Sequence, residues 1–132
     1  MSNRKIGNSF EAEFCEMLFG KGFWVHNLTQ NNAGQPADVI AVKNGKPFLI
    51  DCKVCENDKF VEGRIEPNQR TAMKLWRMCG NGEGWFALQL TDKSVWFIDF
   101  ELMTALFMNA SSINADLIRH YGQPFERWVE RC

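Results

Sequence analysis

The chain has 132 residues, of which 45% are hydrophobic and 23% are charged. This length and composition fit one globular domain and exclude a multidomain protein, a disordered tail, a fibre and a fold as large as an eight-stranded α/β barrel. No apolar run reaches the roughly 18 residues of a membrane-spanning helix, and the first residues lack a secretory-signal pattern, so we expect a cytoplasmic protein. The formal net charge of −1 argues on its own against nucleic-acid binding.

The charge is unevenly distributed along the chain. Residues 1–79 carry a net charge of +2, whereas residues 80–132 carry −3. The N-terminal part is therefore the better partner for a polyanion. Its local field would become more positive if some of its acidic side chains bound metal ions.

Hydrophobic periodicity predicts a helix over residues 6–21, where apolar residues recur at helical spacing and glycines close the segment. Three strand-like runs follow, at residues 23–26, 37–42 and 47–54. The last two flank Asn44-Gly45, the strongest short hairpin signal, because a type I′ turn needs a positive φ at both positions. Residues 27–35 show no periodicity and are expected to form a loop.

A polar loop is predicted over residues 55–66, before a helix that begins at Pro67 and ends at Gly80. The remaining elements are strands at 85–90 and 95–98 and helices at 101–108 and 114–121. The order α-β-β-β-α-β-β-α, with a further short helix, predicts an α/β fold with a mixed central sheet of about five strands flanked by helices.

We expect a single domain over residues 1–132, with its core at about residues 5–100 and a C-terminal helical extension at about residues 101–132. The stretch 102–108 is more apolar than one helix face requires, which indicates either buried core or part of a dimer interface.

The five cysteines are an odd number without a secretory signal, which favours reduced thiols. Cys52 and Cys55 form the one C-x-x-C pair. Because a second pair is missing and both histidines are distant in sequence, the pair predicts core or incidental cysteines rather than a structural zinc site.

The predicted hairpin also determines which residues face one another. In a two-residue loop Lys43 pairs with Lys46, and counting back along both strands places Asp38 opposite Asp51. The alternation makes this a non-hydrogen-bonded pair, with Cα atoms about 4.5 Å apart and both side chains on one face. Pro47 fits the register, because its position needs no N–H donor. We therefore expect two carboxylates in contact.

Opposed like charges destabilise a sheet, so Asp38 and Asp51 should either share a proton or hold a cation between them. Hard oxygen ligands suit Mg²⁺ or Mn²⁺. Lys53 points to the same face as Asp51, because side chains alternate along a strand. The alternative is an ordinary solvated strand face, and the apolar residues that share this face count against it.

A third acid comes from the first helix. Around the helix axis, Glu11 borders the apolar stripe, whereas Glu13 and Glu16 point to solvent. Glu11 could equally be a flanking residue with its carboxylate in water. Gln69 falls on the apolar stripe of the second long helix, where it needs a partner, and the alternative is a hydrogen bond at the helix end.

These residues have the order and spacing of the PD-(D/E)xK nuclease superfamily, which has a restriction-endonuclease-like core. The sequence blocks GNSFE (7–11), GFWV (22–25), ADVIA (37–41), NGK (44–46) and FLIDCKV (48–54) resemble the archaeal-type Holliday junction resolvases, including forms carried by bacteriophages. The resemblance covers about residues 5–100. Two departures stand out: Asp51 replaces the Glu of most members, and His26 lies where archaeal members tend to have Arg.

The resemblance implies a homodimeric endonuclease that uses Mg²⁺, with Mn²⁺ able to substitute, and nicks two strands of a four-way DNA junction symmetrically. By position it implies the metal ligands Glu11, Asp38, Asp51 and the Cys52 carbonyl, and the same three acids with Lys53 and Gln69 as the catalytic set. Lys53 would position the attacking water or stabilise the charge that develops on the phosphate.

DNA contacts are expected from basic and polar side chains around this site, since phosphate contacts position a duplex without reading its bases. The candidates are Arg4, Lys5, His26, Gln30, Asn31, Asn32, Lys59, Arg64, Arg70 and Lys74. Each alone is explained equally well as ordinary surface polarity, and only their grouping favours DNA binding.

Two other functions remain open from the sequence. One is a nuclease of the same fold with another target, as in restriction or repair. The other is a DNA-binding module that has lost catalysis, although the intact set Glu11, Asp38, Asp51 and Lys53 counts against it.

Overall fold

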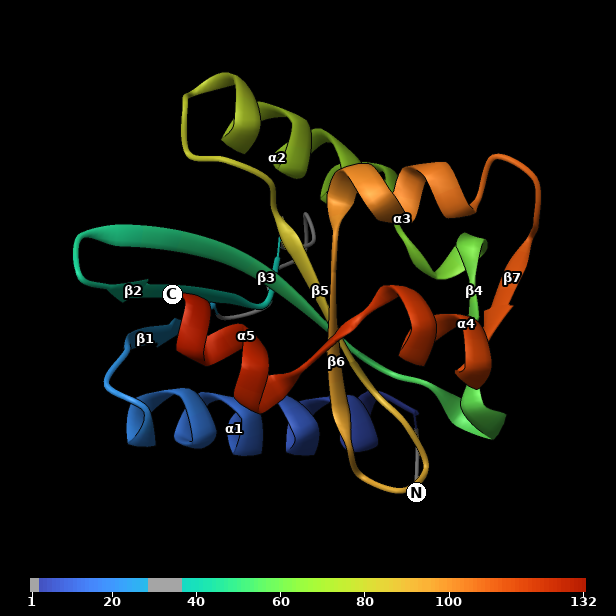
Figure 1. The fold of residues 1–132 in the computed structure, drawn as a ribbon, viewed down its shortest axis with the longest axis horizontal. Coiled ribbons are helices and arrows are strands. Elements are labelled where there is room, and N and C mark those ends of the chain that lie inside the picture. Colours follow the sequence, from blue (N-terminus) through green and yellow to red (C-terminus); the bar gives the residue numbers. More distant parts are fainter. Residues whose placement is uncertain (1–2, 29–36) are drawn as a thin grey trace.

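The computed structural model describes residues 3–28 and 37–132. Its centre is a six-stranded sheet in the order β1-β2-β3-β5-β6-β8, in which β3 and β5 run parallel and the other neighbours antiparallel (Figure 1). The strands are β1 (Trp24–Asn27), β2 (Val39–Lys43), β3 (Lys46–Val54), β5 (Trp85–Gln89), β6 (Val95–Asp99) and β8 (Gln123–Pro124). The predicted class, a mixed sheet flanked by helices, is confirmed, with one strand more than expected.

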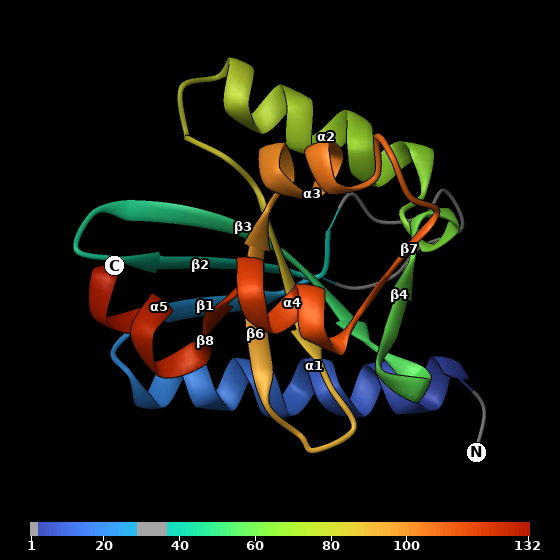
Figure 2. The ribbon, with the colours of Figure 1, turned by 45° about the vertical axis from the view of Figure 1, so that its right-hand side comes forward.

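Helices cover both faces of this sheet (Figures 1 and 2). They are α1 (Asn3–Gly20), α2 (Pro67–Met78), α3 (Phe100–Leu106), α4 (Ala115–Tyr121) and α5 (Phe125–Arg131). One apolar core joins α1 and α5 to the sheet, and a second joins α2, α3 and α4 to its other face. The sheet is therefore enclosed between two helical layers, as its apolar strands require.

The core beneath α1 depends on residues from both ends of the chain. Phe14 and Leu18, which recur at helical spacing, are fully buried. Trp128 of α5 is also buried and stacks on Phe97 of β6 with ring centroids 3.9 Å apart. Residues 101–132, expected as a helical extension, thus also contribute strands and complete the core. Within the apolar stretch 102–108, Met103 and Phe107 are buried.

The hairpin between β2 and β3 forms as predicted. Asn44 has φ = 53° and Gly45 has φ = 77°, the two positive values that a type I′ turn requires. The register pairs Lys43 with Lys46 and continues to Val39 opposite Ile50. The sequence therefore predicted both the turn and the alignment of the two strands.

Short elements inside the predicted loop at 55–66 were not predicted. They are the 3₁₀ turns η1 (Glu56–Asp58) and η2 (Glu62–Arg64) and strand β4 (Lys59–Val61), which pairs with β7 (Ser112–Asn114) in a separate two-stranded sheet. Strands of two or three residues, including β8, are too short to show an alternating pattern, and a partner distant in sequence stabilises them.

The sequence predicted neither a membrane-spanning helix nor a structural zinc site at Cys52 and Cys55. In the described part of the chain, no helix is long and apolar enough to cross a membrane. All five cysteines are free thiols, and Cys52 and Cys55 are buried. These thiols fit the interpretation of Cys52 and Cys55 as core residues.

Candidate active site

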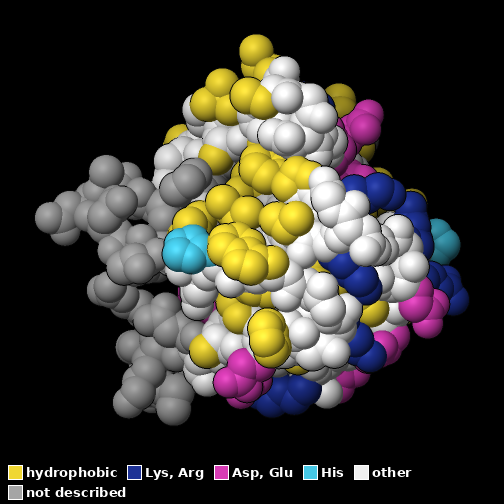
Figure 3. All heavy atoms as spheres, turned by 90° about the vertical axis from the view of Figure 1, so that its left-hand side faces the viewer, with side chains coloured by type: hydrophobic (Ala, Val, Ile, Leu, Met, Phe, Trp, Pro, Cys, Tyr) yellow, Lys and Arg dark blue, Asp and Glu magenta, His cyan; other side chains and the backbone are white. Residues whose placement is uncertain are grey.

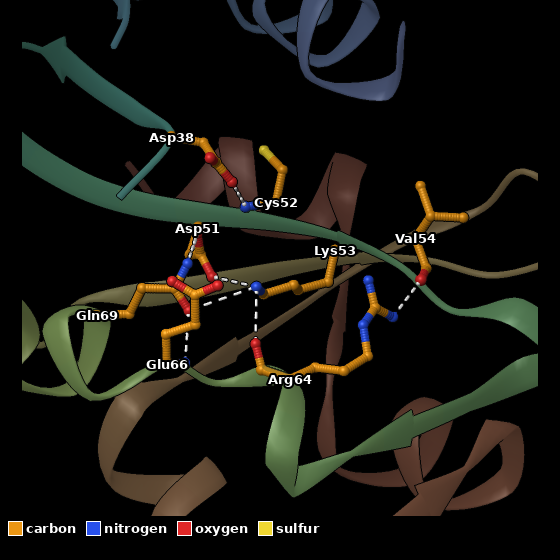
Figure 4. A network of polar contacts seen from close by, with 8 residues as sticks. All are labelled: Asp38, Asp51, Cys52, Lys53, Val54, Arg64, Glu66 and Gln69. Carbon is orange, nitrogen blue, oxygen red and sulfur yellow. Dashed lines mark hydrogen bonds and ion pairs between the residues drawn. The ribbon is translucent and has the colours of Figure 1, made fainter. Parts of the chain in front are cut away.

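The site lies where β2 begins beside the second half of β3. The paired ladder ends at Val39 and Ile50, and the backbone N–H of Asp38 donates to the Ile50 carbonyl at 3.2 Å. Asp38 therefore lies one residue beyond the ladder, and its Oδ2 accepts a hydrogen bond of 2.7 Å from the Cys52 N–H (Figure 4). Asp38 and Asp51 therefore do not form the regular ladder pair that was predicted, but their carboxylates lie close enough to interact, as the prediction of two carboxylates in contact requires.

Asp51 is fully buried on the α2 side of β3. Its Oδ1 accepts a hydrogen bond from Gln69 Nε2 at 3.2 Å, and its Oδ2 lies 3.3 Å from Lys53 Nζ. Within the described residues, Oδ2 accepts no well-aligned hydrogen bond. Burial raises the pKa of Asp51 well above its ordinary value, the nearby Asp38 charge raises it further, and Lys53 opposes both effects.

Lys53 and Gln69 are held in place from the η2–α2 segment (Figure 4). Lys53 Nζ donates to the Arg64 carbonyl at 2.9 Å and lies 3.4 Å from Gln69 Oε1. The same Gln69 Oε1 accepts from the Glu66 N–H at 3.0 Å, as half of a capping box at the start of α2. Gln69 therefore makes the helix-end hydrogen bond of one sequence interpretation and also contacts Asp51, while its role in catalysis stays a prediction.

On the other side of β3, the three acids of α1 differ as predicted. Glu11 is half-buried, whereas Glu13 and Glu16 are exposed. Burial, followed by the charge of Asp38, raises the pKa of Glu11 from 4.5 to about 7. The same surroundings raise the pKa of the Cys15 thiol to about 11, first through burial and then through the charges of Glu11 and Asp38. Asp38 is thus close enough to Glu11 to oppose the ionisation of Glu11.

These oxygens fit a hard divalent cation. Buried carboxylates with raised pKa values and a poorly satisfied Asp51 Oδ2 are the environment that a cation relieves. Among the residues that the structure describes, no three Asp, Glu, His or Cys side chains already form a ligand cluster. Carboxylate oxygens are the ligand type that Mg²⁺ takes in proteins, whereas Zn²⁺ sites are built mainly from nitrogen and sulfur ligands.

The chain matches the family described as archaeal Holliday junction resolvase (Hjc) over residues 1–127. It belongs to this family. The match extends the resemblance inferred from the sequence blocks into the C-terminal quarter of the chain, where residue patterns alone gave no alignment.

Two individual proteins illustrate the relationship. The solved structure of Hjc from Archaeoglobus fulgidus, a Holliday junction resolvase of an archaeal hyperthermophile, shares the fold with a TM-score of 0.72 at 14% identity, over 93% of this chain and 99% of that one. UPF0102 protein FN1370 of Fusobacterium nucleatum is 28% identical over 78 residues, which are 59% of this chain and 66% of that protein. The chain thus matches just under two thirds of the length of this curated relative.

The side chains expected to contact DNA fall into three groups in this resolvase-family chain. His26, Lys59 and Lys74 are exposed. Arg64 and Arg70 contact other residues of the chain. Arg64 Nη1 donates a hydrogen bond to the Val54 carbonyl, and the guanidinium of Arg70 lies 3.9 Å from the carboxylate of Glu62. The remaining side chains lie outside the described part of the chain, and they are those of Arg4, Lys5, Gln30, Asn31 and Asn32.

Two contributors to the site were not predicted. The Arg64 carbonyl accepts a hydrogen bond from Lys53, which is 11 positions away in the sequence. Any residue can supply a backbone carbonyl, so the sequence pattern could not predict this contact. Glu66 was detectable, because a polar residue three positions before Gln69 at a helix start is the spacing of a capping box. Apart from these two, the ring of exposed His26 stacks against the ring of Trp24, with ring centroids 6.1 Å apart. Residues 24 and 26 lie on the same face of β1, so the alternation of side chains along a strand could have predicted that they are neighbours.

Proposed function

We propose that this chain is a metal-dependent endonuclease that resolves four-way DNA junctions by paired symmetric nicks. The observation that carries the proposal is buried Asp51, held between Gln69 and Lys53 and facing the charge of Asp38, in a chain of the Holliday junction resolvase family. A buried acid with an opposed acid and an adjacent lysine is the arrangement that metal-assisted hydrolysis of a phosphodiester requires.

Each residue has a role that follows from its contacts. Glu11, Asp38, Asp51 and the Cys52 carbonyl would hold Mg²⁺ or Mn²⁺, which when bound lowers the pKa of water and offsets charge on the phosphate. Gln69 orients the Asp51 carboxylate through Oδ1. Lys53 Nζ, fixed by the Arg64 carbonyl, places a positive charge beside Asp51, where the phosphate gains negative charge.

The test compares three DNA substrates, a synthetic four-way junction, a linear duplex and a single strand, each with Mg²⁺ and with a chelator. We expect paired symmetric nicks on the junction that require the metal. Cleavage of the linear duplex at equal or greater rate would favour a restriction- or repair-like nuclease of the same fold. Junction binding without cleavage in Mg²⁺ or Mn²⁺ would favour an inactive DNA-binding module.

Paired nicks on two strands need two active sites, so the proposal includes a homodimer. Figure 3 shows hydrophobic side chains gathered on the side of the molecule where β1–β3 and the end of α2 lie. Trp24 of β1 is 62% exposed, and Leu75 and Met78 of α2 are 54% and 78% exposed. Large apolar patches on soluble proteins mark interaction sites, and a second copy of the chain would cover this one.

The dimer is tested by sedimentation of the wild type and of a Leu75→Glu/Met78→Glu variant. Buried charges at the interface should convert the dimer to a monomer, and the monomer should yield unpaired nicks. Tyr121→Glu is a matched control, because Tyr121 is 44% exposed on α4, which lies on the opposite side of the molecule in Figure 1. A wild-type monomer, or a variant that remains dimeric, would contradict the assignment of this surface.

A further inference from the structure

A cavity of about 390 Å³ opens where the parallel strands β3 and β5 end. Val54 and Leu90 supply apolar lining, and the amides of Asn57 and Gln89 supply polar lining. The volume is within the range of small-molecule pockets. The carboxyl ends of parallel strands are also the usual place where open α/β sheets bind ligands.

Gln89 is the feature that makes this cavity a candidate site. It is 8% exposed, and its side chain lines the pocket. Its backbone is fully used, because it pairs with Val54 and Val95 and its carbonyl accepts from the Cys55 N–H at 2.8 Å. The side-chain amide therefore offers a hydrogen-bond donor and an acceptor to a group that enters the pocket.

The cavity is close to the candidate active site. Gln89 is the register partner of Val54, and Val54 directly follows Lys53 on β3 (Figure 4). Val54 lies two residues beyond Cys52, whose N–H binds Asp38, on the same face of the strand. Two strand residues span about 6.6 Å. This is about two nucleotide rises of ~3.4 Å in duplex DNA, so a neighbour of the scissile phosphate can reach the cavity.

We propose that this pocket receives an unstacked base of the cleaved strand and that Gln89 reads its edge. The inference rests on the proposed function and extends it to sequence preference. Bases beside a branch point have lost part of their stacking, so moving one into a pocket costs less than in intact duplex. Val54 and Leu90 then contact the base, and Gln89 offers its amide donor and acceptor.

The amide selects among the bases. A glutamine side chain matches the adenine edge best, because N6 donates to the amide oxygen and N7 accepts from the amide N–H. We therefore expect a preference of about tenfold for junctions with adenine at the position that enters the pocket, which is within the discrimination of one such contact.

The first experiment detects the unstacked base in the absence of cleavage. Four-way junctions carry 2-aminopurine at single positions flanking the nick and are mixed with the protein in chelator. We expect a several-fold fluorescence increase at one position. Glu56→Trp adds bulk at the cavity lining and should abolish the increase, whereas Glu56→Gln removes the same charge without bulk and should keep it.

The second experiment measures preference in Mg²⁺ with each of the four bases at that position. Gln89→Leu should lose the adenine preference, because leucine keeps the volume without the hydrogen bonds. The matched control is Gln123→Leu on β8, whose amide is bonded to Arg131, and it should keep both rate and preference. If Gln89→Leu fails to fold, the base preference of Glu56→Trp is measured in its place, and this variant should also lose the adenine preference.

The outcomes separate this inference from the proposed function. A protein that binds and nicks junctions without a fluorescence increase, or with the same preference in Gln89→Leu and Glu56→Trp as in the wild type, overturns the pocket assignment alone. A protein that neither binds nor nicks junctions overturns both.

Discussion

The two sides of β3 present opposite chemistry at the same strand. On the α2 side, Asp51 has a lysine and a glutamine as partners, and each is fixed by a further backbone contact. On the α1 side, Glu11 and Asp38 lie beside the Cys15 thiol, and the ionisation of Glu11 is opposed by burial and by Asp38. The protein therefore orients the Asp51 carboxylate on the α2 side, whereas on the α1 side Glu11 and Asp38 repel each other, and a cation held by the three acids would offset the charge on both sides.

The largest test of this difference is Asp51→Asn, which keeps the shape of the side chain and removes its charge. We expect junction cleavage to fall by roughly 10³-fold or more, because the phosphate loses the cation that the carboxylate holds. Junction binding in chelator should be retained, since phosphate contacts by basic residues supply most of the affinity. Gel-shift and cleavage assays on one preparation measure both.

Asp116→Asn on α4 is the control for this substitution, because Asp116 is exposed in the first turn of a helix away from the site. It should leave the cleavage rate unchanged. Retained cutting by Asp51→Asn would refute the metal-ligand role and with it the functional difference between the two sides of β3.

Much of the site was predictable because local rules determine it. Asn44-Gly45 requires a type I′ turn, the turn determines the register, and the register places Asp51 and Lys53 on one face. Helical periodicity likewise separates half-buried Glu11 from its exposed neighbours. Each of these inferences needs contacts within about ten residues, which is where sequence patterns are informative.

What escaped prediction depends on long-range contacts or on chain ends. Asp38 leaves the ladder by one residue, and a strict count along paired strands cannot detect where a ladder stops. The tether of Lys53 to the Arg64 carbonyl requires the η2 turn, whose position depends on β4 pairing with β7. Trp128 enters the core only because β6 accepts β8 at the sheet edge.

A smaller effect is expected at Gln69, which serves both α2 and Asp51. Gln69→Leu should lower the cleavage rate by about tenfold, because Asp51 loses its only neutral donor among the described residues, and should cost about 1–3 kcal/mol of unfolding free energy. Glu66→Ala removes the other half of the capping box and should cost about 1 kcal/mol without changing the rate. Chemical denaturation and single-turnover cleavage separate the two roles.

If Gln69→Leu and Glu66→Ala lowered cleavage equally, the effect would come from the start of α2 and not from the Asp51 contact. The α2 side of β3 would then be organised by helix position rather than by the hydrogen bond from Gln69 Nε2.

The smallest expected effect concerns the α1 side and the pH dependence of stability without metal. Because the pKa of Glu11 is raised from 4.5 to about 7 in the folded protein, the folded state binds more protons than the unfolded state between these values. Stability therefore falls as pH rises through this window and is level above it.

We expect the Tm in chelator to decrease by a few degrees from pH 5 to pH 8, and Glu11→Gln to reduce that decrease. Glu13→Gln, an exposed change on the same helix, should not. Mg²⁺ at pH 8 should restore the wild-type Tm and have less effect on Glu11→Gln, since a cation replaces the proton that the acids share. An equal response of both variants to pH and to Mg²⁺ would contradict the prediction that Glu11 shares a proton or a cation with Asp38.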